Sequence, residues 1–458
     1  MIFTLVAIAQ FMVVLDISIT NVALPTIKQS LHFANDSALQ WVITAYALTF
    51  GGFLLLGGRA DDLFGRRRTL LIGMLAFTTF SFLIGISESA TELIVLRALQ
   101  GLAAALMSPS ALSIVLVTFS EGRDRGRALG FWTLVATGGA AVGLLLGGVL
   151  TQYFGWRWNF FINVPVGVLI STAIFKIVPI HAKEEARPSL DLPGAALITT
   201  SLIAQVFAFS KAPEWGWLSG RTIGILALAL VLMAAFLLNE ARAKHPLMPL
   251  SILRIRNVTG ANMIMAPVYA GMLGNFFLMT LYIQTVLHYS PVKTGLSFLP
   301  FPIVLGFTST RIPGFVAKYG FKRFLVAGPL LAAIALVMLS RVPVNGNYWT
   351  NLLPTFLLMP LGIGITFMPV FAAATSGVPS HLSGLASGLI NTSQQMGGAL
   401  GLSIISGIAA SVTAATMHPG SLAALVHGFS RGLWFAAGFM LLAAILAAIV
   451  IRQPKKLG

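Results

Sequence analysis

The sequence Leu15-Asp-Ile-Ser-Ile-Thr-Asn-Val-Ala-Leu-Pro25 closes an apolar run that begins at Ile2. Asp16 lies inside this run, roughly 13 Å short of its end at the rise of an α-helix. An acid at such a depth costs about 2.5–3.5 kcal/mol to insert, and an ion or proton pathway is the usual reason for one. The alternative is a structural aspartate held by Ser18, Thr20 or a neighbouring helix.

The composition is that of a polytopic membrane protein. Of 458 residues, 57% are hydrophobic and 9% are charged, whereas a soluble domain carries about 25% charge. The mean hydropathy is +0.89. The chain has no cysteine, which excludes disulfides and thiolate metal sites. Its 7 histidines fall in predicted loops or at span ends, without an HxxxH pair, so we expect neither a metal site nor a cofactor.

Apolar runs of about 20 residues predict fourteen membrane-spanning helices. Six runs precede the first long polar linker, two lie between the two linkers, and six follow the second. The run at 193–210 is the weakest, and an interfacial segment is the alternative there. The predicted spans are 2–24, 39–58, 69–87, 92–117, 127–150, 158–180, 193–210, 221–240, 258–287, 294–314, 323–340, 351–373, 383–412 and 431–451.

The basic residues predict the orientation of these spans. An even number of spans places both termini on one side. Of the 29 Lys and Arg residues, 20 fall on the side of the 58–69 loop, 7 on the other side and 2 within spans. The positive-inside rule makes the side with 20 cytoplasmic, together with both termini. The net charge of +16 is therefore largely a topology signal, and we expect no nucleic-acid partner.

The acidic residues are distributed still more unevenly. All 13 Asp and Glu residues lie at or before Glu240. The second half of the chain therefore has no carboxylate with which to bind a proton or a cation. Any carboxylate chemistry belongs to the first half.

Two polar linkers, at 181–191 and 241–257, divide the chain into two related halves. We predict an N-terminal six-helix half at 1–180, linkers with two inserted helices at 181–257, and a C-terminal six-helix half at 258–458. The segment that begins Gly58-Arg-Ala-Asp-Asp-Leu-Phe-Gly has a degenerate echo in Gly314-Phe-Val-Ala-Lys-Tyr-Gly. Transporters often carry such internal repeats, with the binding site at the repeat interface.

The loop at 58–68 has features that topology alone does not explain. Gly58 and Gly65 allow close backbone approach or a positive φ. Asp62 stands four residues after Gly58 and four before Arg66, so its carboxylate can cap a helix or pair with a guanidinium. The alternative is a simple positive-inside anchor, which accounts for Arg66 but not for Asp62 or the glycines.

Gly58, Asp62, Gly65 and Arg66 resemble the cytoplasmic loop motif of the major facilitator superfamily. Further segments are similar to motifs of its 14-span drug:proton antiporters, and the resemblance covers nearly the whole chain. One departure is Leu144, where the fifth-span motif usually has proline. The chain also begins almost inside its first span, which leaves a truncated start open. The similar segments are Leu15-Asp16 to Pro25, Leu93-x3-Arg97-x2-Gln100-Gly101, Gly139-x3-Gly143-x3-Gly147-Gly148, Trp156-Arg-Trp-Asn-Phe-Phe-Ile-Asn-Val-Pro165 and Asn391-Thr-Ser-Gln-Gln395.

Arg97 is the second charge predicted inside a span. Asp16 and Arg97 occupy the same half of the membrane, offset by about 6 Å along its normal. Gln100 lies on the Arg97 face at i+3. The resemblance implies a carboxylate that binds the proton or a cation and an arginine that modulates it. The alternative is a structural ion pair that joins the first and fourth spans.

Gly139, Gly143, Gly147 and Gly148 form a stripe of small residues that lets two helices approach closely. Ordinary helix packing explains the stripe. In the family this helix lies where the two halves meet, so the resemblance implies that the seam seals a cavity.

The later half offers neutral polar side chains for a substrate cavity. Asn391 and Gln395 share one helix face, and Asn275 and Tyr282 share another. With Gln100 they form our candidate cavity set. Hydrogen bonding between helices is an equally good explanation for such residues.

We therefore predict an all-α major facilitator fold and a proton-coupled antiporter that exports amphipathic compounds. Its partners would be a small amphipathic substrate, protons and the lipid bilayer. We expect a monomer in a bacterial cytoplasmic membrane. The alternatives are a lipid or metabolite exporter of the same fold, or a uniporter in which Asp16 is vestigial. No polar cluster suggests an enzyme, and a scaffold would not need Asp16.

Overall fold

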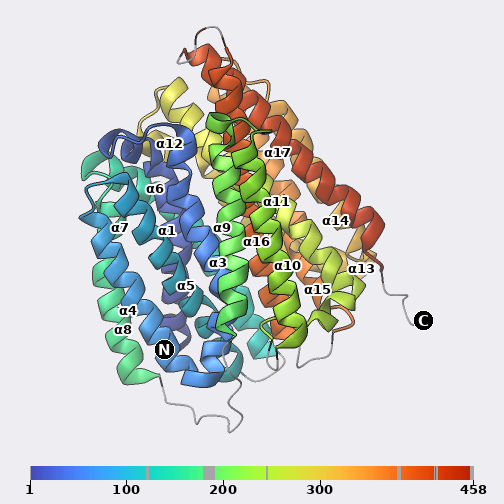
Figure 1. Cartoon of the computed structure of the whole chain (residues 1–458). Helices are drawn as coiled ribbons and strands as arrows, with labels where there is room; N and C mark the ends of the chain where they lie inside the picture. The colour runs from blue at the N-terminus through green and yellow to red at the C-terminus, as the bar shows by residue number, and fades with distance from the viewer. Residues whose placement is uncertain are drawn as a thin grey trace. The chain divides into compact units, whose positions relative to one another are not determined.

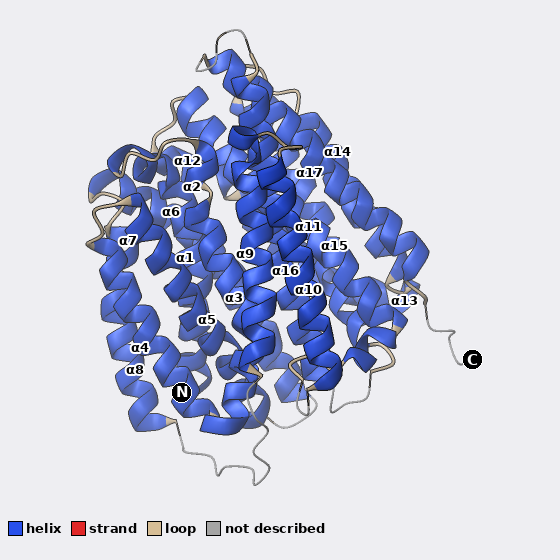
Figure 2. Ribbon diagram, viewed as in Figure 1, coloured by secondary structure: helices blue, strands red, loops and turns tan. Residues whose placement is uncertain are grey.

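The computed structural model describes residues 2–119, 123–178, 191–243, 246–378, 383–416, 418 and 421–453. Within these ranges the chain is helical and contains no strand (Figure 2). This confirms the predicted all-α class.

The helices follow one another with short connections. In chain order they are α1 (Ile2–Ser30), α2 (Asp36–Leu39), α3 (Trp41–Phe64), α4 (Arg66–Gly85), α5 (Ala90–Thr118), α6 (Arg123–Tyr153), α7 (Trp158–Phe161), α8 (Asn163–Ile177), α9 (Leu192–Trp215), α10 (Gly220–Arg242), the 3₁₀ turn η1 (Leu250–Arg254), α11 (Arg256–Leu281), the π turn η2 (Tyr282–Val286), α12 (Pro291–Phe298), α13 (Pro300–Tyr319), α14 (Lys322–Leu339), the π turn η3 (Tyr348–Leu352), α15 (Leu353–Thr375), α16 (Ser383–Ala414) and α17 (Leu422–Val450).

Thirteen helical segments of the described chain are long and apolar enough to cross a membrane. In addition, α6 has 31 residues and an apolar part at Gly138–Tyr153. Together these helices account for the fourteen predicted runs. The doubtful run at 193–210 forms a helix of 24 residues, which is long enough to span a bilayer.

Several helices extend beyond their predicted ends, α1 and α3 by six residues each. α1 continues through Pro25 to Ser30, although proline removes one intrahelical hydrogen bond. Leu24 and Ile27 are fully buried, and their packing offsets that loss. α3 continues to Phe64, so most of the predicted 58–68 loop is helix and Gly65 alone separates α3 from α4.

The chain divides into two compact units. The first comprises Met1–Ser201, Val231–Leu247 and Tyr289–Leu299; the second comprises Leu202–Leu230, Met248–His288 and Pro300–Gly458. The short helix α12 therefore packs with the first unit although it follows α11 in sequence. Our three-part division by sequence stays a prediction.

The first unit is built on close helix pairs, α1 with α6 and α3 with α5 (Figure 1). Glycines make both crossings close. A Cβ added to Gly101 of α5 would lie 2.3 Å from the carbonyl oxygen of Tyr46 in α3. This close approach brings the side chains of α5 within reach of the α3 backbone.

The second unit repeats part of this design. α11 packs on α16, as α1 packs on α6. A Cβ added to Gly397 or Gly401 of α16 would lie 2.4 Å from the Ala266 carbonyl oxygen or 2.1 Å from the Ala270 Cβ. The first and fifth long helices of each half thus meet through small residues.

Candidate functional site

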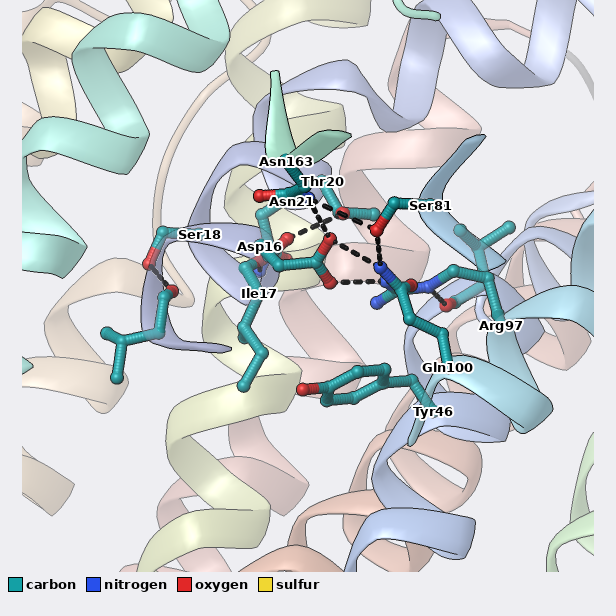
Figure 3. Close-up of polar contacts among 12 residues, drawn as sticks. Asp16, Ile17, Ser18, Thr20, Asn21, Tyr46, Ser81, Arg97, Gln100 and Asn163 are labelled. Carbon is teal, nitrogen blue, oxygen red and sulfur yellow. Dashed lines mark hydrogen bonds and ion pairs between the residues drawn. The ribbon is translucent and has the colours of Figure 1, made fainter. Parts of the chain in front are cut away.

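Asp16 lies near the middle of α1 and is fully buried. Arg97 reaches it from α5, with 2.5 Å between the guanidinium Nη1 and the carboxylate Oδ2 (Figure 3). The Arg97 side chain is 1% exposed. The structure therefore joins Asp16 and Arg97, two of the charges that the sequence places inside spans, as a buried ion pair.

Further contacts hold the guanidinium of Arg97 in place. Its Nε donates to the carbonyl oxygen of Val42 in α3, at 2.9 Å. Its Cζ lies 4.4 Å from the centre of the Tyr46 ring and 5.8 Å from that of Phe160. Aromatic faces stabilise a cation most strongly where water is excluded. α3 and α7 thus fix the direction in which Arg97 points.

Gln100 links both members of the pair. Its Oε1 accepts from Arg97 Nη1 at 2.6 Å, and its Nε2 donates to Asp16 Oδ1 at 2.9 Å. The same Nε2 donates to Ser81 Oγ in α4, at 2.8 Å. We predicted Gln100 as part of a substrate cavity. The structure places it, fully buried, inside the hydrogen-bond network of Asp16.

Asn163 and Ser81 complete this network, and neither was predicted from the sequence as a site residue. Asn163, the first residue of α8, donates its Nδ2 to Asp16 Oδ1 at 3.1 Å and to Ser81 Oγ at 3.5 Å. A signal for Asn163 existed, since it lies in the quoted segment from Trp156 to Pro165. Ser81 has no such signal, because only the packing of α4 brings it here.

The alternative partners within α1 do not hold the carboxylate. The Ser18 hydroxyl donates to the Val14 carbonyl oxygen at 3.1 Å, and the Thr20 hydroxyl donates to the Asp16 carbonyl oxygen at 2.7 Å (Figure 3). Both hydroxyls therefore satisfy the helix backbone. The partners of the carboxylate come from neighbouring helices.

Three side-chain donors compensate the buried charge of Asp16. As a carboxylate, Asp16 accepts from Arg97, Gln100 and Asn163, which offsets the cost of burying the charge. A protonated carboxyl has one acceptor site fewer and gains a donor. Protonation therefore weakens the link between α1 and α5, and Arg97 keeps the Val42 carbonyl and the Tyr46 ring as alternative partners.

The end of α3 and the start of α4 contain a second group of predicted site residues. Gly65 has φ +86°, a conformation that favours glycine. Asp61 is buried and accepts a hydrogen bond from the Ser110 hydroxyl of α5. Gly58 is helical and faces Pro109, and Arg66 begins α4. The side chain of Asp62 lies outside the described residues.

The glycines of α6 pack mainly on α1. A Cβ added to Gly143 would lie 2.8 Å from the Ser18 Cβ, and one added to Gly147 would lie 2.9 Å from Ile19 Cγ1. Gly139 faces Phe11 of the same helix. The glycines of α6 therefore contact α1 on both sides of Asp16 along the sequence.

Gly148 faces a different neighbour. A Cβ added there would lie 2.7 Å from the carbonyl oxygen of Pro291, the first residue of α12. Conversely, a Cβ on Gly295 of α12 would lie 2.3 Å from the Leu144 carbonyl oxygen. α6 and α12 thus touch backbone to backbone through glycine on each side.

The candidate cavity residues of the later half have mixed surroundings. The Tyr282 hydroxyl donates to the Pro343 carbonyl oxygen at 2.6 Å, which ties η2 to the connection after α14. Asn275 and Gln395 are buried, and Asn391 is half-buried. A contact that we did not anticipate joins α16 to α11, where the Ser393 hydroxyl donates to Asn262 Oδ1 at 2.7 Å.

A bundle of spanning helices around a buried, hydrogen-bonded acid and guanidinium defines the class of secondary membrane transporters. The chain belongs to the Major Facilitator Superfamily, whose sequence model matches residues 6–402. This confirms the family that the motifs indicated.

Several similar proteins are named for drug resistance or export. The puromycin resistance protein pur8 of Streptomyces alboniger is 40% identical over 97% of this chain and 89% of its own length. The tetracenomycin C resistance and export protein of Streptomyces glaucescens is 36% identical over 89% of this chain and 75% of its own. The multidrug resistance protein Stp of Mycobacterium tuberculosis is 33% identical over the same shares.

Solved structures agree with the fold. The POT family transporter PepTSo covers 98% of this chain and 97% of its own, with a TM-score of 0.72 and 16% identity. The xylose transporter XylE of E. coli covers 100% and 97%, with a TM-score of 0.65 and 15% identity. Identities this low speak for the fold alone.

Proposed function

We propose that this protein exports small amphipathic compounds across the cytoplasmic membrane in exchange for protons, with Asp16 as the proton-binding group and Arg97 as its modulating partner. The observation that carries the proposal is the full burial of Asp16 among three side-chain donors in a spanning helix. The printed names of the relatives, which concern antibiotic resistance and export, support the class of cargo.

Exchange of substrate for protons follows if the two ligands favour different charge states of the Asp16–Arg97 pair. When Asp16 is ionised, its carboxylate fastens α1 to α5 through Arg97. When Asp16 is protonated, that bond weakens and the guanidinium contributes an uncompensated positive charge. A cationic substrate is then disfavoured near the cluster, because like charges repel. Proton and substrate therefore favour different states of the protein, which is the requirement for coupling.

We place both termini and the α3–α4 connection on the cytoplasmic side. The support is the excess of Lys and Arg on that side, 20 against 7. The proposed partners are a small amphipathic substrate, protons and the lipid bilayer, and we expect the protein to work as a monomer.

Transport by purified protein in proteoliposomes tests the proposal. An imposed pH gradient should drive concentrative accumulation of ethidium or puromycin by the unchanged protein. Asp16→Asn should abolish accumulation while retaining substrate-for-substrate exchange, which needs no proton. Asp36→Asn is the matched control, since Asp36 pairs with Lys28 at 2.6 Å outside the apolar part of the bundle.

The outcome also separates the alternatives. Concentrative transport by Asp16→Asn would assign Asp16 to a structural ion pair. Equilibration without accumulation by the unchanged protein, whatever the pH gradient, would indicate a uniporter with a vestigial acid.

A further inference from the structure

The surface of the second unit has a groove between α14 and α17, of about 590 Å³. The two helices pack side by side, with α17 drawn in red (Figure 1). Leu330, Ile334 and Arg341 line it from α14 and the residue after its cap, and Trp434, Gly438 and Leu441 line it from α17. Apart from Arg341, the side chains that line the groove are apolar.

The lining residues run in opposite directions along the two helices. Two spans, α15 and α16, separate α14 from α17, so the two helices run antiparallel, and this order pairs the Arg341 end of α14 with the Trp434 end of the α17 lining. The eleven positions from Leu330 to Arg341 correspond to roughly 16 Å of helix. The hydrocarbon core of a bilayer is about 30 Å thick, so the groove has the length of one leaflet.

One end of the groove is suited to a membrane interface. Trp434 is 45% exposed, and indole rings favour the headgroup level. Arg341 is exposed directly after α14, and Arg431 is exposed one turn before Trp434. Residues 241–458 contain no Asp or Glu, so the later half of the sequence has no carboxylate to neutralise this positive end.

The floor of the groove is open at Gly438. A Cβ built on this glycine would have no heavy atom within 4 Å, and its φ is not positive. Neither close helix packing nor backbone conformation therefore explains a glycine here. Its effect is to leave room for another molecule's chain.

We propose that the groove binds an anionic phospholipid, with one acyl chain beside Gly438 and the phosphate at Arg341. The leaflet is the outer one if the proposed orientation holds, and the site itself does not depend on transport. Arg341 disfavours the alternative occupant, a cationic amphiphile on its way out. Guanidinium binds phosphate, as it binds carboxylate, with two parallel hydrogen bonds.

Native mass spectrometry of the purified full chain tests the site with two lipids that differ only in headgroup. We expect phosphatidylglycerol to be retained roughly fivefold more than phosphatidylcholine with the same acyl chains. Arg341→Gln should remove this preference. Gly438→Leu should reduce retention of both lipids, because the added side chain fills the groove.

Two control variants share the chemistry but not the groove. Arg221 and Gly224 of α10 are exposed, and a Cβ on Gly224 also has open space. Arg221→Gln and Gly224→Leu should retain both lipids unchanged. Equal retention of the two lipids by the unchanged protein, or unchanged retention by Gly438→Leu, would overturn the proposal. A dimer that Gly438→Leu dissolves would also overturn it, in favour of a second copy of the chain.

A labelling measurement tests the same proposal independently of native mass spectrometry. The chain has no cysteine, so Gly438→Cys introduces a single thiol. A membrane-soluble maleimide should label it more slowly in phosphatidylglycerol than in phosphatidylcholine. Equal rates in the two lipids would contradict occupation by the anionic lipid. Neither measurement involves transport, so failure of the proposed export function leaves this test intact.

Discussion

Gly143 of α6 packs against the backbone of Leu15, the residue before Asp16. A Cβ on Gly143 would lie 3.0 Å from the Leu15 carbonyl oxygen and 2.8 Å from the Ser18 Cβ. The packing of α6 therefore determines where α1 holds its acid. This relationship connects a stripe of small residues, which sequence alone explains as ordinary packing, to the charged cluster.

Gly143→Ala should accordingly impair the protein through α1. The added methyl group displaces α1 or α6, and overpacking of this kind costs about 1–3 kcal/mol. We expect a lower midpoint of thermal unfolding and slower proton-driven efflux. Gly138→Ala is the control, because a Cβ at that position of the same helix meets no atom within 4 Å. Equal behaviour of the two variants would show that the seam does not constrain Asp16.

Asp16→Asn should destabilise the fold as well as stop coupled transport. The substitution leaves the buried guanidinium of Arg97 without its counter-charge, which costs about 3–5 kcal/mol when a buried pair is broken. The double variant Asp16→Asn/Arg97→Gln should recover part of that loss. Thermal unfolding in detergent measures both. A double variant less stable than Asp16→Asn alone would contradict this account.

Asn163 should matter for coupling, whereas Asn159 should matter only for packing. Both are buried, but Asn163 donates to Asp16, while Asn159 donates to Thr151 at 2.7 Å. Each alanine variant should lose about 1–3 kcal/mol of stability, because a buried partner is left unsatisfied. Only Asn163→Ala should lower proton-driven accumulation relative to substrate-for-substrate exchange. The same ratio in both variants would remove Asn163 from the coupling site.

The connection between α3 and α4 should control turnover more than binding. Asp61 accepts from Ser110 and thereby joins α3 to α5, and Asp62 follows it in sequence. We expect Asp62→Asn and Asp61→Asn to lower the maximal efflux rate several-fold with little change in the substrate Kd. Ser110→Ala should reproduce the effect of Asp61→Asn. Unchanged turnover of purified Asp62→Asn would exclude Asp62 from the mechanism.

Substrates with one positive charge should be preferred over those with two. An unpaired charge in low dielectric costs several kcal/mol, so a dication needs about two carboxylates. Asp16 is one, and residues 241–458 contain none. Ethidium and propidium share a ring system and differ in charge, so they form a matched pair. Saturable, proton-coupled transport of propidium at a rate equal to that of ethidium would refute the prediction.

Much of this architecture follows from local sequence. Each span is an apolar run long enough to form a helix in a bilayer, and only helices and closed barrels satisfy their backbone there. Helix ends were less predictable. Pro25 and Gly58 suggested boundaries, but buried neighbours continue α1 to Ser30 and α3 to Phe64.

The cluster around Asp16 was only partly predictable. Depth along the helices brought Asp16 and Arg97 to a similar level, and the i+3 spacing added Gln100. Ser81 and Asn163 come from α4 and α8, whose faces toward α1 depend on tertiary packing. Hydropathy patterns carry no information about which span lies beside which, so these two donors emerged from the structure.

The surroundings of Arg97 have an electrical consequence. The side chains hydrogen-bonded to the Asp16–Arg97 pair are Gln100 and Asn163, both neutral. The cluster is therefore neutral with Asp16 ionised and carries one net positive charge when a proton binds. Moving one elementary charge across a membrane is worth about 2.3 kcal/mol per 100 mV. Any shift of the protonated cluster along the membrane normal is then work done with or against the membrane voltage. The voltage therefore exerts a force on α1 and α5, which carry the cluster, even when the pH is equal on both sides.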